Sequence, residues 1–187
     1  MANRVPEASV ESSVAAVEWA AVFAGALGAI GFTIILFAFG SALGFSAAAP
    51  WSLSTRAPTE FGLAAGIWMI VMQWLSAALG GYLTGRMRTK WVGIRTDEVF
   101  FRDTAHGFFA WALATVVMAL LVTLGSAVAA SVVAATAPDA AAAAAPPAEQ
   151  VRQVAVGFSF FTALSLLIGA FIGAAAGALG GFHRDEA

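Results

Sequence analysis

The feature that most constrains this sequence is a set of four long apolar stretches, at about residues 19–45, 61–85, 108–135 and 154–182. Each is longer than the roughly 20 residues that an α-helix needs to cross a bilayer. Charged residues make up only 11% of the chain, whereas a soluble domain contains about 25%. We therefore expect an all-α integral membrane protein with four transmembrane helices, in a single membrane domain that covers residues 1–187.

The remaining composition argues against several classes of function. The chain has no cysteine, which excludes disulfides, thiol catalysis and zinc sites built on cysteine. Its net charge of -2 predicts no general attraction to nucleic acid. No glycine-rich phosphate loop, Ser/His/Asp order or pair of facing carboxylates stands out. We expect no enzymatic activity, no catalytic residues, no cofactor and no metal site.

Basic residues concentrate between the second and third apolar stretches, in segment 86–105. Together with Arg4 and Arg184 they place seven of the nine basic residues on one side of the membrane. By the positive-inside rule this loop and both termini are cytoplasmic, and the Ala/Pro-rich loop 136–153 lies outside. The interleaved aromatic side chains suggest contact with headgroups and with anionic lipid, although a purely topological role is the simpler interpretation. The loop's basic residues are Arg86, Arg88, Lys90, Arg95 and Arg102.

An internal repeat relates the two halves of the chain. The segment FGSALGFSAAAP at 39–50 resembles LGSAVAASVVAATAP at 124–138 with an offset of 85, which also aligns Glu18 with Asp103. Each repeat would contain two spans, so both copies enter the membrane in the same orientation. We expect a duplicated helical hairpin, a parallel repeat with its pseudo-twofold axis along the membrane normal.

Glycines recur at four-residue spacing and predict close helix packing, because glycine lets two backbones approach in lipid. The fourth stretch has the longest stripe, and three GxxxG pairs lie in the first and second stretches, one of them Gly62 with Gly66. Two interpretations remain open: the stripes pack helices within one bundle, or they form a contact between subunits. These glycines are Gly40, Gly44, Gly81, Gly85, Gly169, Gly173, Gly177 and Gly181.

Four polar residues lie near the middle of the apolar stretches, namely Thr33, Gln73, Thr123 and Ser165. They could meet at the membrane midplane and hydrogen-bond across the bundle, with Gln73 bonding Thr33 or a backbone carbonyl. The alternative is a polar patch that receives a substrate, an ion or a quinone. No acidic or basic residue accompanies them, which argues against proton-coupled or ion-coupled transport.

Charged residues and the two histidines mark the cytoplasmic ends of the helices. We expect Glu18 to approach Arg86, and Asp103 or His106 to approach Arg184 or His183. At a wet interface such pairs contribute about 0–1 kcal/mol and set register more than stability. The histidines are expected to be ordinary interfacial side chains rather than metal ligands.

Three longer segments together resemble a known family: WAAVFAGALGAIGFTIILFAFGSALGFSAAAPW, LGGYLTGRMR and RTDEVFFRDTAHGFFAWALAT. They are similar to uncharacterised inner-membrane proteins of alphaproteobacteria that are often labelled PhnA-like. The resemblance covers nearly the whole chain and implies a multi-pass protein of the bacterial inner membrane. It supplies no activity and no catalytic residues, and a chain without cysteine cannot build the zinc ribbon that the label suggests.

Three functions fit these features. The favoured one is an accessory or scaffolding membrane protein that self-associates, or binds a larger membrane complex, through its Gly/Ala-rich helix faces. The second is an oligomeric channel, since a bundle packed on small residues leaves little lumen in one chain. The third is a protein that binds anionic lipid through its basic and aromatic loop.

Overall fold

The computed structural model describes residues 16–43, 58–91, 93, 95–136 and 148–186. Its described part is built from four α-helices: α1 (Trp19–Ala42), α2 (Pro58–Met87), α3 (Thr96–Thr136) and α5 (Ala148–Asp185). Each helix contains a stretch that is long and apolar enough to cross a membrane. The expected all-α class with four such helices is confirmed.

The helices are longer than predicted at several ends. Helix α3 begins at Thr96 rather than near 108, so the predicted loop 86–105 shrinks to the connection after Met87. Asp97 and Glu98 lie in the first turn of α3, where acidic side chains favour the positive end of the helix dipole. Residues 148–153 of the predicted outer loop belong to α5, and residues 137–147 lie outside the described part.

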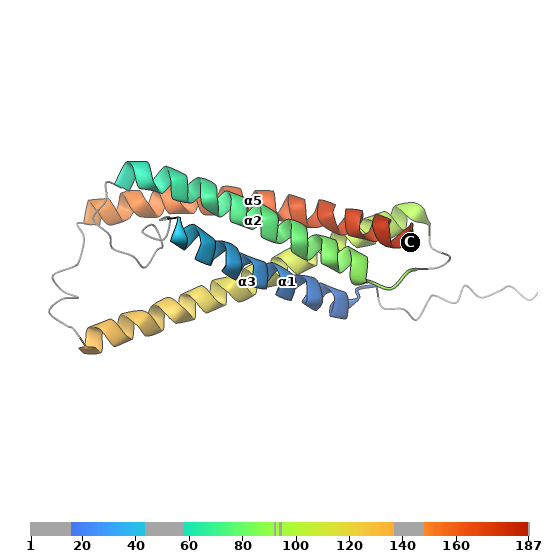
Figure 1. Ribbon diagram of the computed structural model, residues 1–187, viewed down its shortest axis with the longest axis horizontal. Helices are drawn as coiled ribbons and strands as arrows, with labels where there is room; N and C mark the ends of the chain where they lie inside the picture. Colours follow the sequence, from blue (N-terminus) through green and yellow to red (C-terminus); the bar gives the residue numbers. More distant parts are fainter. Residues whose placement is uncertain (1–15, 44–57, 92, 94, 137–147, 187) are drawn as a thin grey trace, which may run out of the picture.

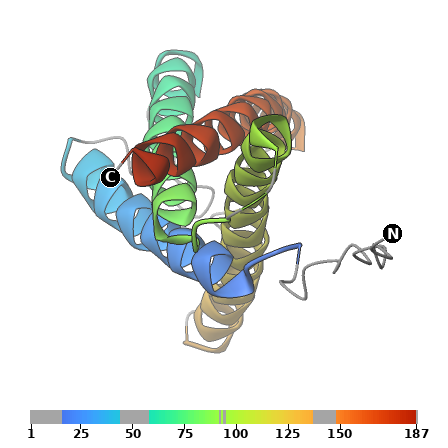
Figure 2. The same ribbon diagram turned by 90° about the vertical axis from the view of Figure 1, so that its right-hand side faces the viewer.

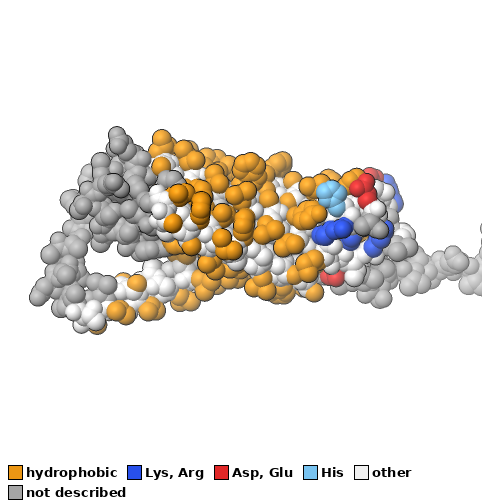
Figure 3. Space-filling view, viewed as in Figure 1, with side chains coloured by type: hydrophobic (Ala, Val, Ile, Leu, Met, Phe, Trp, Pro, Cys, Tyr) orange, Lys and Arg blue, Asp and Glu red, His pale blue; other side chains and the backbone are white. Residues whose placement is uncertain are grey.

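The four helices form a bundle with two unlike ends (Figures 1 and 2). We call the end that holds Trp19, Met87, Thr96 and Asp185 the charged end, because charged side chains gather there (Figure 3). Helices α1 and α3 run away from this end, and α2 and α5 run back toward it. Helix α2 packs most extensively on α5, while α1 contacts α2 and α3 but not α5 within the described residues.

The glycines of α5 explain the tight packing at the charged end. A side chain at Gly81 would strike the backbone of Gly173, and one at Gly85 would lie 2.7 Å from the backbone nitrogen of Gly181. A side chain at Gly177 would lie 2.7 Å from the Cα of Gly107 on α3. The stripe on α5 therefore packs against α2 and α3 of the same chain, as expected for packing within one bundle.

Small residues also join α1 to its neighbours. Gly25 lies against the backbone of Gly80 and the side chain of Thr84, and Ala26 and Ala29 pack with Ala114 of α3 in the core. Farther along α1, Gly40 lies against the ring of Trp68 on α2. The other glycine of that predicted pair, Gly44, lies outside the described residues.

Helix α3 leaves the bundle beyond its middle. Ala110 and Ala114 are buried against the other helices, whereas every described side chain from Ala119 to Thr136 is exposed. Leu121 and Val128 follow Ala114 at seven-residue spacing and so lie on the same helix face, yet they are 54% and 62% exposed. Small side chains hold α3 close near the charged end, and beyond them the helix diverges from the bundle, as Figures 1 and 3 show.

Candidate functional site

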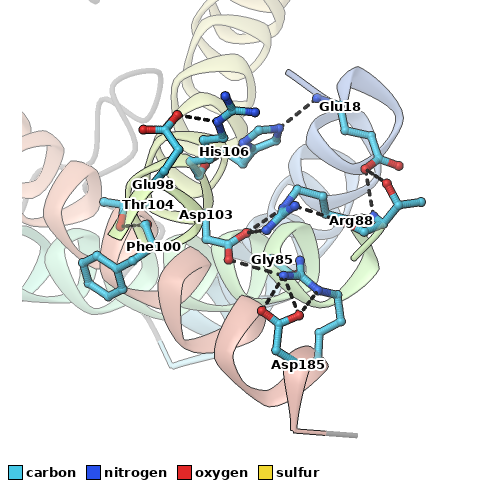
Figure 4. A network of polar contacts seen from close by, with 12 residues as sticks. Glu18, Gly85, Arg88, Glu98, Phe100, Asp103, Thr104, His106 and Asp185 are labelled. Atoms are coloured by element: carbon cyan, nitrogen blue, oxygen red, sulfur yellow. Dashed lines mark hydrogen bonds and ion pairs between the residues drawn. The ribbon is translucent and has the colours of Figure 1, made fainter. Parts of the chain in front are cut away.

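A buried carboxylate, Asp103, joins three helices at the charged end (Figure 4). Arg88, the residue after α2, donates from Nε to Asp103 Oδ1 at 2.6 Å, and its Nη2 lies 2.5 Å from the same oxygen. Arg184 of α5 approaches the other carboxylate oxygen at 3.5 Å. The side chains of Arg88 and Asp103 are 0% and 3% exposed, so the protein covers almost all of this ion pair.

The fold makes room for this carboxylate with glycine. A side chain at Gly181 would strike the Asp103 carboxylate, and one at Gly177 would lie 2.5 Å from the Asp103 backbone oxygen. Arg184 then closes the site from α5, with Nη1 donating to the carbonyl of Gly85 at 3.0 Å. The glycine stripe thus brings the α5 backbone close enough for its arginine to reach a carboxylate on α3.

Arg88 is held on its remaining sides by the connection that follows it. Its Nη1 donates to the carbonyl of Thr89 at 3.0 Å, and its guanidinium lies 4.2 Å from the ring centroid of Trp91. Arg102 lies 4.1 Å from the same ring centroid, so the indole contacts two cations. Burial lowers the pKa of Arg88 from its ordinary value, and the hydrogen bond and charge of Asp103 oppose that change.

A second group of contacts ties α1 to the same end. The carboxylate of Glu18 accepts hydrogen bonds from the backbone N–H of Thr89 at 2.8 Å and from its hydroxyl at 2.9 Å. The backbone N–H of Glu18 donates to Nε2 of His106 at 2.8 Å. His106 is 1% exposed, and its Nδ1 lies 2.6 Å from the carbonyl of Arg102. Glu18 therefore connects the start of α1 both to the α2–α3 connection and to α3.

The predicted ionic pairs at this end are partly correct. The contact between Asp103 and Arg184 is confirmed. The predicted pair of Glu18 with Arg86 is wrong, because Glu18 bonds Thr89 while the Arg86 guanidinium donates to the carbonyl of His183. His183 itself lies on the exposed side of α5, where its Nδ1 is 3.4 Å from the hydroxyl of Tyr82.

The basic loop does not face outward as a unit. The expectation that Arg88 faces lipid is wrong, because its side chain is enclosed by Asp103 and Trp91. Other basic side chains of the segment are also engaged within the chain: Arg102 pairs with Glu98 at 2.5 Å, Lys90 donates to the carbonyl of Asp185 at 2.9 Å, and exposed Arg95 approaches Asp97 at 3.4 Å.

The four midplane polar residues do not assemble into one patch. Thr33 and Thr123 donate to the carbonyls four residues earlier in their own helices, at 2.8 and 2.7 Å. Ser165 donates to Thr162 of its own helix, and Thr123 lies on the exposed half of α3. The hydrogen bonds of the described residues do not include the predicted bond between Gln73 and Thr33. Gln73 instead lies against α5, where its Nε2 would be 2.6 Å from a side chain at Gly169.

Sequence reasoning missed three residues of this site: Arg88 as a buried cation, Thr89 as the partner of Glu18, and Trp91 as the ring that covers the arginines. An arginine in a loop rich in basic residues has the same sequence signal whether it marks topology or pairs inside the fold. The four-residue spacing of Glu98 and Arg102 suits an ion pair on a helix surface. It could have predicted that α3 begins before Glu98 and therefore contains Asp103.

The contacts of this site clamp helices together at the charged end. Within the part of the chain that the structure describes, no group of three or more His, Asp or Glu side chains is placed to hold a metal ion. No protein-family model matches this sequence, and comparison with curated proteins and with solved structures finds no significant match. The site must therefore be interpreted from its own geometry.

Proposed function

We propose that this protein is a multi-pass scaffold of the bacterial inner membrane that assembles with further copies of itself. The exposed apolar surface supports a location in lipid, since large apolar side chains such as Leu167 and Phe171 are 71% and 72% exposed. Among the described residues six basic side chains, including Arg95 and Arg102, lie at the charged end, whereas Arg152 lies near the start of α5 at the other end. By the positive-inside rule this end and both termini are cytoplasmic.

Helix directions support the proposed duplication. Helices α1 and α3 both begin at the charged end, and their carboxylates Glu18 and Asp103 both accept hydrogen bonds from the connection after α2. Helices α2 and α5 both return to that end and pack on each other through glycine. The chain is thus interpreted as two parallel helical hairpins, with the pseudo-twofold axis running along the bundle.

The observation that carries the scaffold function is the exposure of α3 from Ala119 to Thr136. At 1.5 Å per residue this part is about 27 Å long, nearly the thickness of the hydrocarbon core, and no other helix within the described residues covers it. The glycine stripe on α5 is occupied by contacts within the chain. Helix α3 is therefore the element that we assign to assembly, in place of the glycine stripe.

A second copy of this chain is the partner that this surface fits best. Small side chains follow one face of α3 at helical spacing, at Thr123, Ala127, Ala130 and Ala134, which permits close approach of another helix. Two copies inserted in the same orientation would present parallel α3 helices with identical faces, as an isologous contact requires. One face of a helix about 27 Å long and 10 Å wide covers roughly 270 Å² per chain, so two α3 helices that meet through this face form a small contact that depends on close backbone approach.

Disulfide crosslinking in native membranes tests this function, because the chain has no cysteine of its own. Ala127→Cys and Ala134→Cys should form disulfide-linked dimers on oxidation. Val132→Cys, on the opposite face of the same helix, is the matched control and should crosslink much less. A linked product that contains a different polypeptide would replace self-association with a foreign partner. The absence of any crosslink at all three positions would overturn the assignment of α3 to assembly.

A further inference from the structure

One buried histidine connects the beginning of α1 to α3. His106 is 1% exposed and lies in the third turn of α3, with the ring of Trp91 edge-on at a centroid distance of 6.1 Å. The backbone N–H of Glu18 donates to its Nε2 at 2.8 Å. Beside this bond, Trp19 stacks on Phe109 of α3 at a centroid distance of 6.3 Å. The histidine therefore makes the polar contact that fixes Glu18, the residue before α1, against α3 (Figure 4).

The partners of the ring require its neutral form. Nε2 accepts the Glu18 N–H and so carries no proton, whereas Nδ1 donates to the carbonyl of Arg102 at 2.6 Å. We assign the Nδ1–H tautomer from these two partners. Adding a proton at Nε2 would place two N–H donors against each other at hydrogen-bond distance, and the contact would become repulsive.

The charges around the ring leave no acceptor for a second proton. On α1 the Glu18 carboxylate is occupied by the N–H and hydroxyl of Thr89. After α2 the Arg88 cation faces the ring, and on α3 Asp103 is committed to Arg88. From α5, Arg184 adds a further positive charge beside Asp103, and on α3 itself Arg102 pairs with Glu98. An imidazolium here would meet the Arg88 cation and a backbone donor, and the carboxylates of Glu18 and Asp103, whose charges would attract it, already bond other donors.

We propose that His106 is a proton-responsive latch, which holds the start of α1 to α3 while it is neutral and releases it when it is protonated. Histidine is the side chain whose ordinary pKa, about 6.5, lies nearest to cytoplasmic pH. The folded state with the latch closed binds one proton fewer than the open state, so acidification favours opening. The latch responds at the charged end and leaves the glycine contacts of α2 with α5 unchanged.

The chain offers a matched control because it contains only two histidines, His106 and His183. His183→Gln leaves His106 as the single histidine, whose tautomer and protonation can then be followed by imidazole ¹⁵N NMR of the full-length protein in nanodiscs. Hydrogen exchange at the Glu18 amide reports whether the latch is closed. His106→Gln keeps a carbonyl oxygen that can accept the Glu18 N–H but cannot titrate near neutral pH.

In the His183→Gln protein we expect the Nδ1–H tautomer at pH 8. Protonation on acidification toward pH 5 should accompany a roughly two- to tenfold loss of protection at the Glu18 amide, the range for losing one hydrogen bond. In His106→Gln this protection should not change with pH. The proposal is overturned if His106 carries the other tautomer, stays neutral to pH 5, or titrates without opening at Glu18. If His106→Gln loses the same protection on acidification, the proton that opens the contact binds Glu18 and not His106, and the proposal fails. If His106→Gln does not fold, the His183→Gln measurements decide alone.

Discussion

The contact of α5 with α3 predicts the effect of adding a single methyl group at Gly177. The new Cβ would lie 2.5 Å from the backbone oxygen of Asp103 and 2.7 Å from the Cα of Gly107. Both distances fall roughly 1 Å short of an ordinary contact of about 3.5 Å, and the obstructing atoms are backbone, so a whole helix must move. Overpacking of this kind typically costs about 1–3 kcal/mol. We therefore expect Gly177→Ala to destabilise the monomer by that amount.

Gly157, on the same helix, is the matched control. A Cβ there would meet no atom within 4 Å, so the substitution changes stability only through the higher helix propensity of alanine. Gly157→Ala should be neutral or stabilising by up to about 1 kcal/mol. The two variants should then differ by at least about 1 kcal/mol in the free energy of unfolding.

Reversible unfolding of the purified monomer in mixed micelles measures this difference. Equal stabilities for the two variants, or a larger loss for Gly157→Ala, would refute the packing of the α5 stripe against α3. A Gly177→Ala protein with an unchanged monomer but a lost assembly would show that the stripe contacts a partner instead.

Two further predictions concern the charged end. Asp103→Asn leaves the buried Arg88 without its counter-charge and should lower the free energy of unfolding by about 3–5 kcal/mol. Asp97→Asn, at an exposed position, should leave the free energy of unfolding unchanged, and unfolding in micelles compares the two variants. Single cysteines at Arg95 and Ala143 should react with an impermeant reagent from opposite sides of the membrane, Ala143→Cys in intact spheroplasts and Arg95→Cys only after permeabilisation. Labelling of both from the same side would contradict the orientation derived from the basic residues.

Much of the fold could be predicted from the sequence because lipid leaves few choices for a backbone. Four apolar stretches of spanning length predict four helices, and glycines at four-residue spacing predict where helices approach closely. The stripe on α5 alone did not reveal its partners. Gly173 and Gly177 each lie against both α2 and α3, so the same spacing serves two neighbours at once.

The candidate site was predictable in place but only partly in its contacts. Charged residues at helix ends indicated a cluster that includes Glu18, Asp103 and Arg184. The burial of Arg88 could not be inferred, because it depends on how Trp91 folds back and on the start of α3 at Thr96. Near the turn, Gly93 has a φ of 83°, a conformation that L side chains rarely adopt and that the sequence does not report.

The divergence of α3 was also hidden from the sequence. Its residues from Ala119 to Thr136 are as apolar and as rich in small side chains as the packed segments, so composition does not distinguish a covered helix from an uncovered one. Tilt and exposure follow from packing near the charged end, where Ala110 and Ala114 hold α3 to the bundle. Exposure of this half is nevertheless the observation on which the proposed assembly depends.

Native mass spectrometry of the protein released directly from its own membrane tests that central proposal most directly. A scaffold that assembles through α3 should appear as a complex whose mass is a multiple of the 19.1 kDa chain. Ala130→Phe, which enlarges the proposed contact face, should shift that complex to the single-chain mass. A wild-type protein that appears only as a 19.1 kDa chain with bound lipid would contradict the account.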